Sequence, residues 1–180
     1  MTVTPAIYKA DELADFTDHL GEIDDIFFAS SAKQSFSGSE EKASFRERWL
    51  GRYIAHHKAS LFVGLDGSHR VIGYLAGCLD EPSALAHFSD ISYFQIIGDI
   101  CRDYPAHLHI NVAPQWRNRG LGAALVEQFA CWAKQHSVEG IHLVTGSAAR
   151  SIAFYRRSGF RELRTFHWNS AISVCMGRKL

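Results

Sequence analysis

The sequence has no net charge, no long apolar run and no paired cysteines, and each of these absences argues against a class of protein. Lys plus Arg equals Asp plus Glu at 19 each, so no overall field draws the chain to nucleic acid or to an acidic membrane surface. No stretch approaches the roughly 20 apolar residues of a membrane-spanning helix, and the first residues carry no export signal. We expect a cytoplasmic protein with neither nucleic acid nor membrane as a partner.

Metal-binding patterns are also missing. The four cysteines form no Cys-x-x-Cys motif, which favours reduced thiols in the core. Among the ten histidines, His56 and His57 are adjacent, and His107 and His109 form a pair without nearby acidic or thiol ligands. The sequence therefore gives no reason to expect a metal site.

What is present predicts one α/β (α+β) domain over residues 1–180. A chain of 180 residues that is 47% hydrophobic can bury one core and is short for two. Strand-like and helical patterns alternate and end in an antiparallel pair, which favours a mixed sheet flanked by helices. The expected strands are 3–8, 60–65, 71–79, 107–112, 140–145, 161–168 and 172–178. The expected helices are 11–32, 37–57, 115–135 and 149–158.

The most informative segment is Arg117-Asn118-Arg119-Gly120-Leu121-Gly122, between a predicted strand and the strongest helical pattern. A helix start offers free backbone N–H groups and a partial positive charge to an anion. Gly120 and Gly122 remove obstructing side chains, and the two arginines suit a pyrophosphate. The order of these residues excludes a P-loop and a Rossmann turn, whereas glycines that merely start a helix remain the alternative interpretation.

Two motifs resemble one family. Arg-x-x-Gly-x-Gly after Val112-Ala113-Pro114 resembles the acetyl-CoA signature of the GCN5-related N-acetyltransferase (GNAT) superfamily, and residues 153–160 resemble its second motif. More narrowly, residues 104–110 resemble a bacterial subgroup similar to the acetyltransferase-like domain of O-GlcNAcases. The resemblance implies the GNAT fold, with about seven strands, about four helices, and strands that splay at the cofactor groove.

The resemblance also implies acetyl-CoA as co-substrate and assigns roles to residues. A backbone N–H near Asn111 or Val112 would polarise the acetyl carbonyl, and Tyr155 would protonate the departing thiolate. Simple packing beside Phe154 is the alternative for Tyr155. The implied cofactor-binding residues are Val112, Ala113, Pro114, Arg117, Asn118, Arg119, Gly120, Leu121, Gly122, Ala123, Phe154 and Tyr155.

The chain departs from the family pattern near both motifs. Ala148 stands where the family often has a cofactor-contacting asparagine, and Ser151 replaces the usual alanine. In the narrower subgroup an aspartate is common at the position of Asn111, and an amide cannot accept a proton. His109 is then the best placed base, although a strand histidine can also be a hydrogen-bonded core residue. Weaker candidates are Asp99, Glu81 and His142.

The expected activity is direct transfer of acetyl to a primary amine of a small molecule, sugar or peptide in a ternary complex. The alternative is an inactive acetyl-CoA-binding or regulatory module of the same fold. Segments 30–40, 80–105 and 168–172 would wall the acceptor groove, and the second of these is expected to form short helices. A homodimer is plausible only by analogy with the superfamily.

Overall fold

The computed structural model describes residues 5–147 and 150–180 of the chain. These residues pack as two compact units, described in turn below. Among the described residues, the first unit comprises 5–77 and 109–129, and the second comprises 78–108, 130–147 and 150–180. Three elements run from one unit into the other: β3 (Val71–Cys78), β4 (Ala106–Val112) and α6 (Leu121–Gln135).

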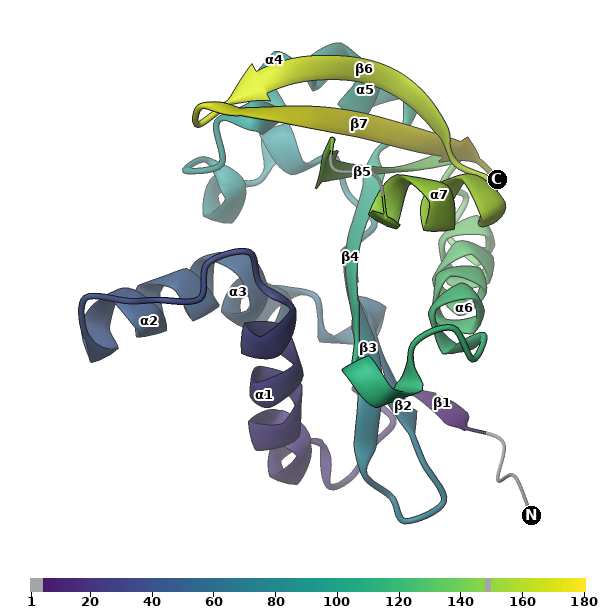
Figure 1. Cartoon of the computed structure of the whole chain (residues 1–180). Helices are drawn as coiled ribbons and strands as arrows, with labels where there is room; N and C mark the ends of the chain where they lie inside the picture. Colours follow the sequence, from purple (N-terminus) through teal and green to yellow (C-terminus); the bar gives the residue numbers. More distant parts are fainter. Residues whose placement is uncertain (1–4, 148–149) are drawn as a thin grey trace. The chain divides into compact units, whose positions relative to one another are not determined.

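The first unit is built on four neighbouring strand segments (Figure 1). β1 (Ala6–Lys9) pairs antiparallel with β2 (Leu61–Leu65), and β2 pairs antiparallel with β3. The end of β4 follows β3 in the strand order. Every residue of β2 and β3 is buried, as is typical of strands that are covered on both faces.

Helices cover these strands on both sides. Figure 1 shows α1 (Leu20–Ser30) on one side of the strands and α6 on the other. α2 (Ser39–Arg46) and α3 (Arg52–His56) follow α1 along the chain, joined by a π-helical segment over Glu47–Gly51. The expected helix over 37–57 is therefore made of three pieces.

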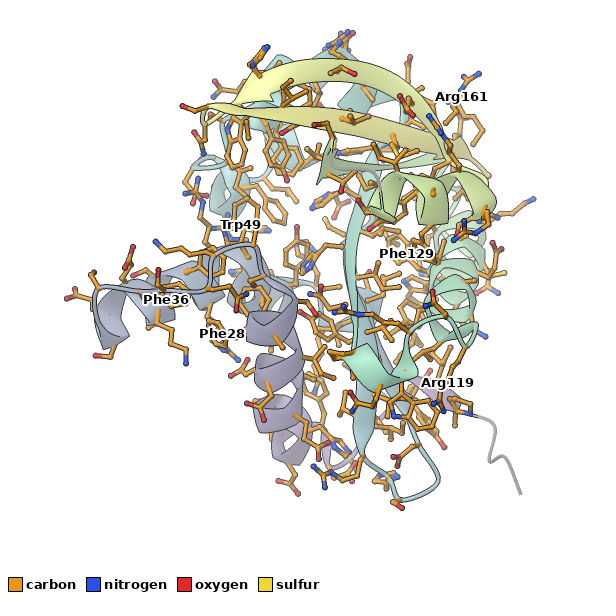
Figure 2. The ribbon with its side chains drawn as sticks, in the orientation of Figure 1. Phe28, Phe36, Trp49, Arg119, Phe129 and Arg161 are labelled. Atoms are coloured by element: carbon orange, nitrogen blue, oxygen red, sulfur yellow. The ribbon has the colours of Figure 1, made fainter. Side chains whose placement is uncertain are left out.

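Glycines in the sheet fix where α6 begins. Gly64 and Gly73 are partners in the β2–β3 register, and a Cβ on either would lie 2.8 or 3.0 Å from a methyl carbon of Leu121, the first residue of α6. Two turns along the helix, the ring of Phe129 (labelled in Figure 2) occupies the space that a Cβ on Gly77 would need. Because these glycines have no side chains, the helix can lie close to the sheet.

The second unit contains the beginning of β4, then β5 (Gly140–Gly146), β7 (Ala171–Lys179) and β6 (Arg161–Trp168), in that order. β4 pairs parallel with β5 at Ala106 and His107, and β7 pairs antiparallel with both β5 and β6. α7 (Arg150–Arg157) links β5 to β6. The connection before β4 forms short helices, as expected, including α4 (Tyr93–Ile96) and α5 (Gly98–Asp103).

The sheet confirms the predicted fold class. Its seven strands follow the order β1-β2-β3-β4-β5-β7-β6 and combine parallel and antiparallel pairs. The described residues form seven α-helices rather than about four, because short helices precede β2 and β4. None of the described helices is long and apolar enough to cross a membrane.

Candidate functional site

His109 and Asn111 project from the same face of β4, as their alternation predicts. The ring of His109 meets that of Tyr53 from α3 edge-on, with centroids 4.8 Å apart, and that of Tyr74 from β3 at 6.3 Å. The amide of Asn111 donates to the hydroxyl oxygen of Tyr74 at 2.8 Å. Two tyrosines thus hold the predicted catalytic residues of β4 in place.

The electrostatics of this face keep His109 neutral. Burial lowers the pKa of His109 to about 4, because a shielded imidazolium loses its hydration. Within the described part of the chain, no hydrogen-bond partner reaches its Nε2. A neutral imidazole with an unused ring nitrogen can accept a proton, which is the first requirement of a general base.

The backbone at the end of β4 presents one amide to the edge opposite β3. Ala113 donates its N–H to the carbonyl of Ile72 in β3 at 3.0 Å. Successive N–H groups of a strand point to opposite edges, so the N–H of Asn111 also faces β3 and that of Val112 faces the other way. Of the two amides that the sequence left open, Val112 therefore has the better orientation for a carbonyl outside this pair of strands.

Arg117 and Arg119 are both exposed, but their guanidinium groups have different neighbours. Arg117 donates from Nε to the carbonyl oxygen of Val112 at 3.0 Å and from a terminal nitrogen to the hydroxyl of Ser30 at 3.3 Å. The guanidinium of Arg119 lies over the ring of Trp116, 5.2 Å from its centroid, an arrangement that a cation and an aromatic face favour. Figure 2 marks Arg119 at the loop before α6. The guanidinium of Arg117 therefore makes hydrogen bonds within the protein, whereas that of Arg119 is the more available of the two for an external anion.

The loop reaches the helix through two residues with positive φ. Asn118 has φ of 60° and Gly120 has φ of 86°, a region that glycine enters without strain. The carbonyl of Gly120 accepts the first helical bond, from Ala124 at 3.0 Å. The N–H groups of Leu121, Gly122 and Ala123 precede that ladder, so intrahelical bonds do not use them.

Open space surrounds Gly120. A Cβ placed on this residue would meet no atom of the described residues within 4 Å, so none of their side chains fills the position. Turns in which backbone N–H groups converge make anion-binding concavities, and a helix start adds its dipole. The predicted diphosphate cradle is thus compatible with the local geometry, while the binding roles of residues 112–123 stay predictions.

Tyr155 and Phe154, the other predicted cofactor residues, belong to α7 in the second unit. The ring of Tyr155 packs between Phe154 and Phe160, at centroid distances of 5.1 and 5.8 Å. Burial raises the pKa of Tyr155, so its hydroxyl keeps its proton at neutral pH. Both the packing role and the proton-donor role agree with these contacts.

The departures near the second motif have different outcomes. The hydroxyl of Ser151 lies 2.8 Å from that of Thr145, so the unusual serine ties the first turn of α7 to β5. Ala148 lies outside the described residues. The effect of the missing asparagine on cofactor binding therefore stays a prediction.

The weaker base candidates have other partners. Arg164 forms a bidentate pair with Asp99, at 2.8 and 2.6 Å, and holds the pKa of that carboxyl at about 2. His142 contacts the carbonyl of Tyr104 at 2.5 Å and is fully buried, which lowers its pKa to about 4. Glu81 accepts a hydrogen bond from Ser83. These contacts leave His109 as the base candidate whose ring nitrogen is unengaged.

The predicted residues thus fall into two groups. The first unit brings together His109, Asn111 and the loop residues 112–123, whereas Phe154 and Tyr155 lie in the second unit. Sequence reasoning missed Tyr53 and Tyr74, which surround His109, and the glycine pair of β2 and β3. Tyr53 carried a usable signal, since Phe45, Trp49, Tyr53 and His57 recur every four residues along the helix expected over 37–57.

Solved structures of other proteins share this fold. SsHAT is similar over 98% of both chains, with a TM-score of 0.76 and 23% identity. Naa20 of Chaetomium thermophilum, solved with a bisubstrate analogue, gives a TM-score of 0.62 at 20% identity and covers 99% of this chain and 87% of its own. The phosphinothricin acetyltransferase Pat of Sinorhizobium meliloti, solved with AcCoA, gives 0.61 at 20% identity over 100% and 89%.

The fold and the glycine-opened helix start define a mixed α/β protein with a glycine-containing loop between its fourth strand and α6. The sequence model of the acetyltransferase (GNAT) family matches residues 24–160, which is more than half of the chain. The protein belongs to this family, and the suspected superfamily membership is confirmed. The narrower subgroup stays a prediction.

Proposed function

We propose that the protein transfers the acetyl group of acetyl-CoA directly to a primary amine of a small molecule, sugar or peptide. Membership of the acetyltransferase family supports acetyl transfer. Similar proteins were solved with AcCoA and with a bisubstrate analogue. The observation that carries the proposal is the open backbone cradle at Gly120, directly after the strand edge that presents Val112.

The loop residues fit the phosphates of acetyl-CoA. The N–H groups of Leu121, Gly122 and Ala123 and the side chain of Arg119 would hold the pyrophosphate. No Cβ at Gly120 obstructs its approach. The asparagine missing at Ala148 removes one contact seen in the family, so the cradle would carry a larger share of the binding free energy.

Acetyl-CoA supplies a thioester, whose carbonyl carbon the amine attacks as the carbon–sulfur bond breaks. The N–H of Val112 would stabilise the negative charge that develops on the carbonyl oxygen. Arg117 supports this role because its bond to the Val112 carbonyl fixes the same peptide segment.

Two side chains are proposed to move protons. His109 would take the proton that the amine releases, since its Nε2 is neutral and unengaged. Tyr155 would give its hydroxyl proton to the thiolate, as the second motif implies, and its raised pKa means that the hydroxyl is protonated at neutral pH. No cysteine lies in either motif, in agreement with transfer without an acyl-enzyme.

The arm between α1 and α2 favours an acceptor with an apolar part. Phe36 lies 5.8 Å from Phe28 and 5.4 Å from Phe45, and the ammonium of Lys42 lies 4.4 Å from the Phe28 ring centroid. Figure 2 labels Phe28 and Phe36 on this arm. Aromatic rings suit an acceptor with an apolar part. The arm carries Lys33 and Lys42 beside Glu40 and Glu41, so it offers no excess of negative charge to a polycationic substrate.

Thermal stability and thiol release test the proposal together. Acetyl-CoA should raise the Tm of the protein, and a panel of primary amines should yield free CoA thiol that Tyr155→Phe suppresses. Stabilisation without release by any amine would favour the inactive acetyl-CoA-binding module. Absence of any thermal shift with acetyl-CoA would overturn both.

A further inference from the structure

Three metal-ligand side chains meet in the first unit, outside the groups discussed above. Asp15 precedes a 3-10 turn that His19 ends, and His69 lies in the turn between β2 and β3. One carboxylate oxygen and one ring nitrogen from each histidine all lie within 4.8 Å of one another. Asp15 and His19 are four residues apart in the sequence, whereas His69 lies about fifty residues further along, so the fold brings the third residue to the other two.

The spacing of these atoms suits a small cation. Asp15 Oδ2 lies 3.5 Å from His19 Nε2 and 3.1 Å from His69 Nε2. A tetrahedral metal with bonds of 2.0–2.1 Å separates its ligand atoms by about 3.4 Å. Both edges from Asp15 lie near that value, and the edge between the two histidine nitrogens is at most 4.8 Å, so the three atoms could share one ion after small side-chain rotations.

His19 provides an independent observation. Its side chain is 8% exposed, and no hydrogen-bond partner in the described residues satisfies its Nε2. A buried polar atom without a partner costs free energy. The same nitrogen faces the oxygen of Asp15, where a bound cation would satisfy it.

The turn that carries His69 is organised before any ligand binds. The carboxylate of Asp66 accepts hydrogen bonds from the N–H groups of Ser68 and Arg70, at 2.9 and 3.0 Å. His69 is held at φ of 61°, which a non-glycine residue adopts at some cost. A turn fixed in this way presents the imidazole with little further loss of entropy.

Glu22 of α1 joins the turn to the helix. Its carboxylate accepts the N–H of Val71 at 2.7 Å and pairs with Arg70. The same carboxylate lies 3.7 Å from Nδ1 of His19. A carboxylate beside the second nitrogen of a ligating histidine helps to orient the ring.

We propose that Asp15, His19 and His69 bind a divalent transition metal of the zinc class. Two imidazoles and one carboxylate are the donors that zinc prefers, whereas magnesium and calcium prefer oxygen ligands alone. Asp15 and His69 have side chains 43% and 57% exposed, which leaves a path for the ion and a fourth position for water. The bound metal staples the β2–β3 turn to the start of α1.

Calorimetric titration of metal-free protein with ZnCl2 tests the site. We expect one zinc ion per chain, together with a rise in Tm that MgCl2 does not produce. Co²⁺ in place of zinc should give the strong visible absorption of a tetrahedral ion. His69→Ala and Asp15→Asn should each weaken zinc binding more than about tenfold, and both positions are exposed enough to keep the fold.

His167→Ala is the matched control, because His167 is an exposed histidine of β6. This variant should bind zinc as the parent protein does. If the parent takes up no zinc, or if His69→Ala binds it with unchanged affinity, the cluster is only an ionic network between the turn and α1. Both results are independent of acetyl-CoA binding, so they leave the proposed acetyl transfer untouched.

Discussion

Arg117 donates from Nε to the carbonyl oxygen of Val112 across 3.0 Å. The carbonyl and the N–H of a strand residue point to the same edge. Arg117 therefore binds the carbonyl oxygen of Val112 and does not use the N–H of Val112, which points to the same edge. A loop arginine thereby keeps the last peptide of β4 in a fixed orientation. This internal role differs from the phosphate-binding role that the sequence motif alone implies for Arg117.

Arg117 and Arg119 should therefore respond differently to removal. Arg119→Ala is expected to raise the Kd for acetyl-CoA about tenfold, because it removes a charged donor, with little change in the Tm of the free protein. Arg117→Ala should lower that Tm as well, because the bonds to Val112 and Ser30 are lost. Calorimetry and thermal melts without ligand separate the two, and equal Tm values would contradict the internal role of Arg117.

Gly120→Ala should impair both folding and cofactor binding. The φ of 86° costs an alanine about 1–2 kcal/mol, and the new methyl group enters the space assigned to the phosphates. Gly21→Ala is the control, because Gly21 lies in α1 and a Cβ there also meets nothing within 4 Å. That change should be neutral or stabilising. An acetyl-CoA Kd unchanged in Gly120→Ala would count against the cradle.

The sequence predicted the parts of the site that depend on neighbouring residues. The glycine loop, the strand before it and the helix after it are local patterns, so their positions could be inferred from residues 107–135. The packing of Tyr53 and Tyr74 around His109 could not, because it joins α3, β3 and β4.

Two other features that the sequence did not predict also depend on residues far apart in the chain. Gly64 and Gly73 look like ordinary strand glycines in the sequence, and only the register shows that both receive Leu121. The cluster of Asp15, His19 and His69 escaped notice because a turn far along the chain supplies its third residue. Long-range pairing creates such sites, and no single-sequence pattern records it.

Tyr155→Phe separates a proton donor from a packing residue. The phenyl ring keeps the contacts with Phe154 and Phe160, so the Tm should barely change. Loss of a general acid should lower kcat by about a hundredfold or more, with the KM for acetyl-CoA nearly unchanged. Steady-state kinetics decide the matter. A variant with normal kcat would assign Tyr155 to packing alone.

Stability should fall with acidification through the interval set by the buried histidines. Burial lowers the folded-state pKa of His109 and His142 to about 4, whereas an unfolded histidine titrates near about 6.5. Between these values the unfolded chain binds more protons, so stability is complete above about pH 6.5 and declines toward about pH 4. His109→Gln should flatten the profile of Tm against pH, and His167→Gln should not. A profile that does not change in His109→Gln would show that its imidazole is not buried as neutral.

Gly64 and Gly73 should tolerate alanine unequally although they face each other in the sheet. The atom nearest to a new Cβ at Gly64 is a methyl carbon of Leu121, which can rotate, whereas at Gly73 the backbone oxygen of Asn111 and the Cα of Val112 lie within 3.1 and 3.3 Å. Gly64→Ala should cost stability alone, and the smaller side chain of Leu121→Val should partly restore it.

Gly73→Ala must displace the end of β4, so it should lower kcat as well as Tm, and Leu121→Val should restore neither fully. Thermal melts and amine acetylation rates of the two single and two double variants measure these differences. If Leu121→Val rescued Gly73→Ala completely, contact with the helix side chain, rather than with the backbone of Val112, would be the function of that glycine.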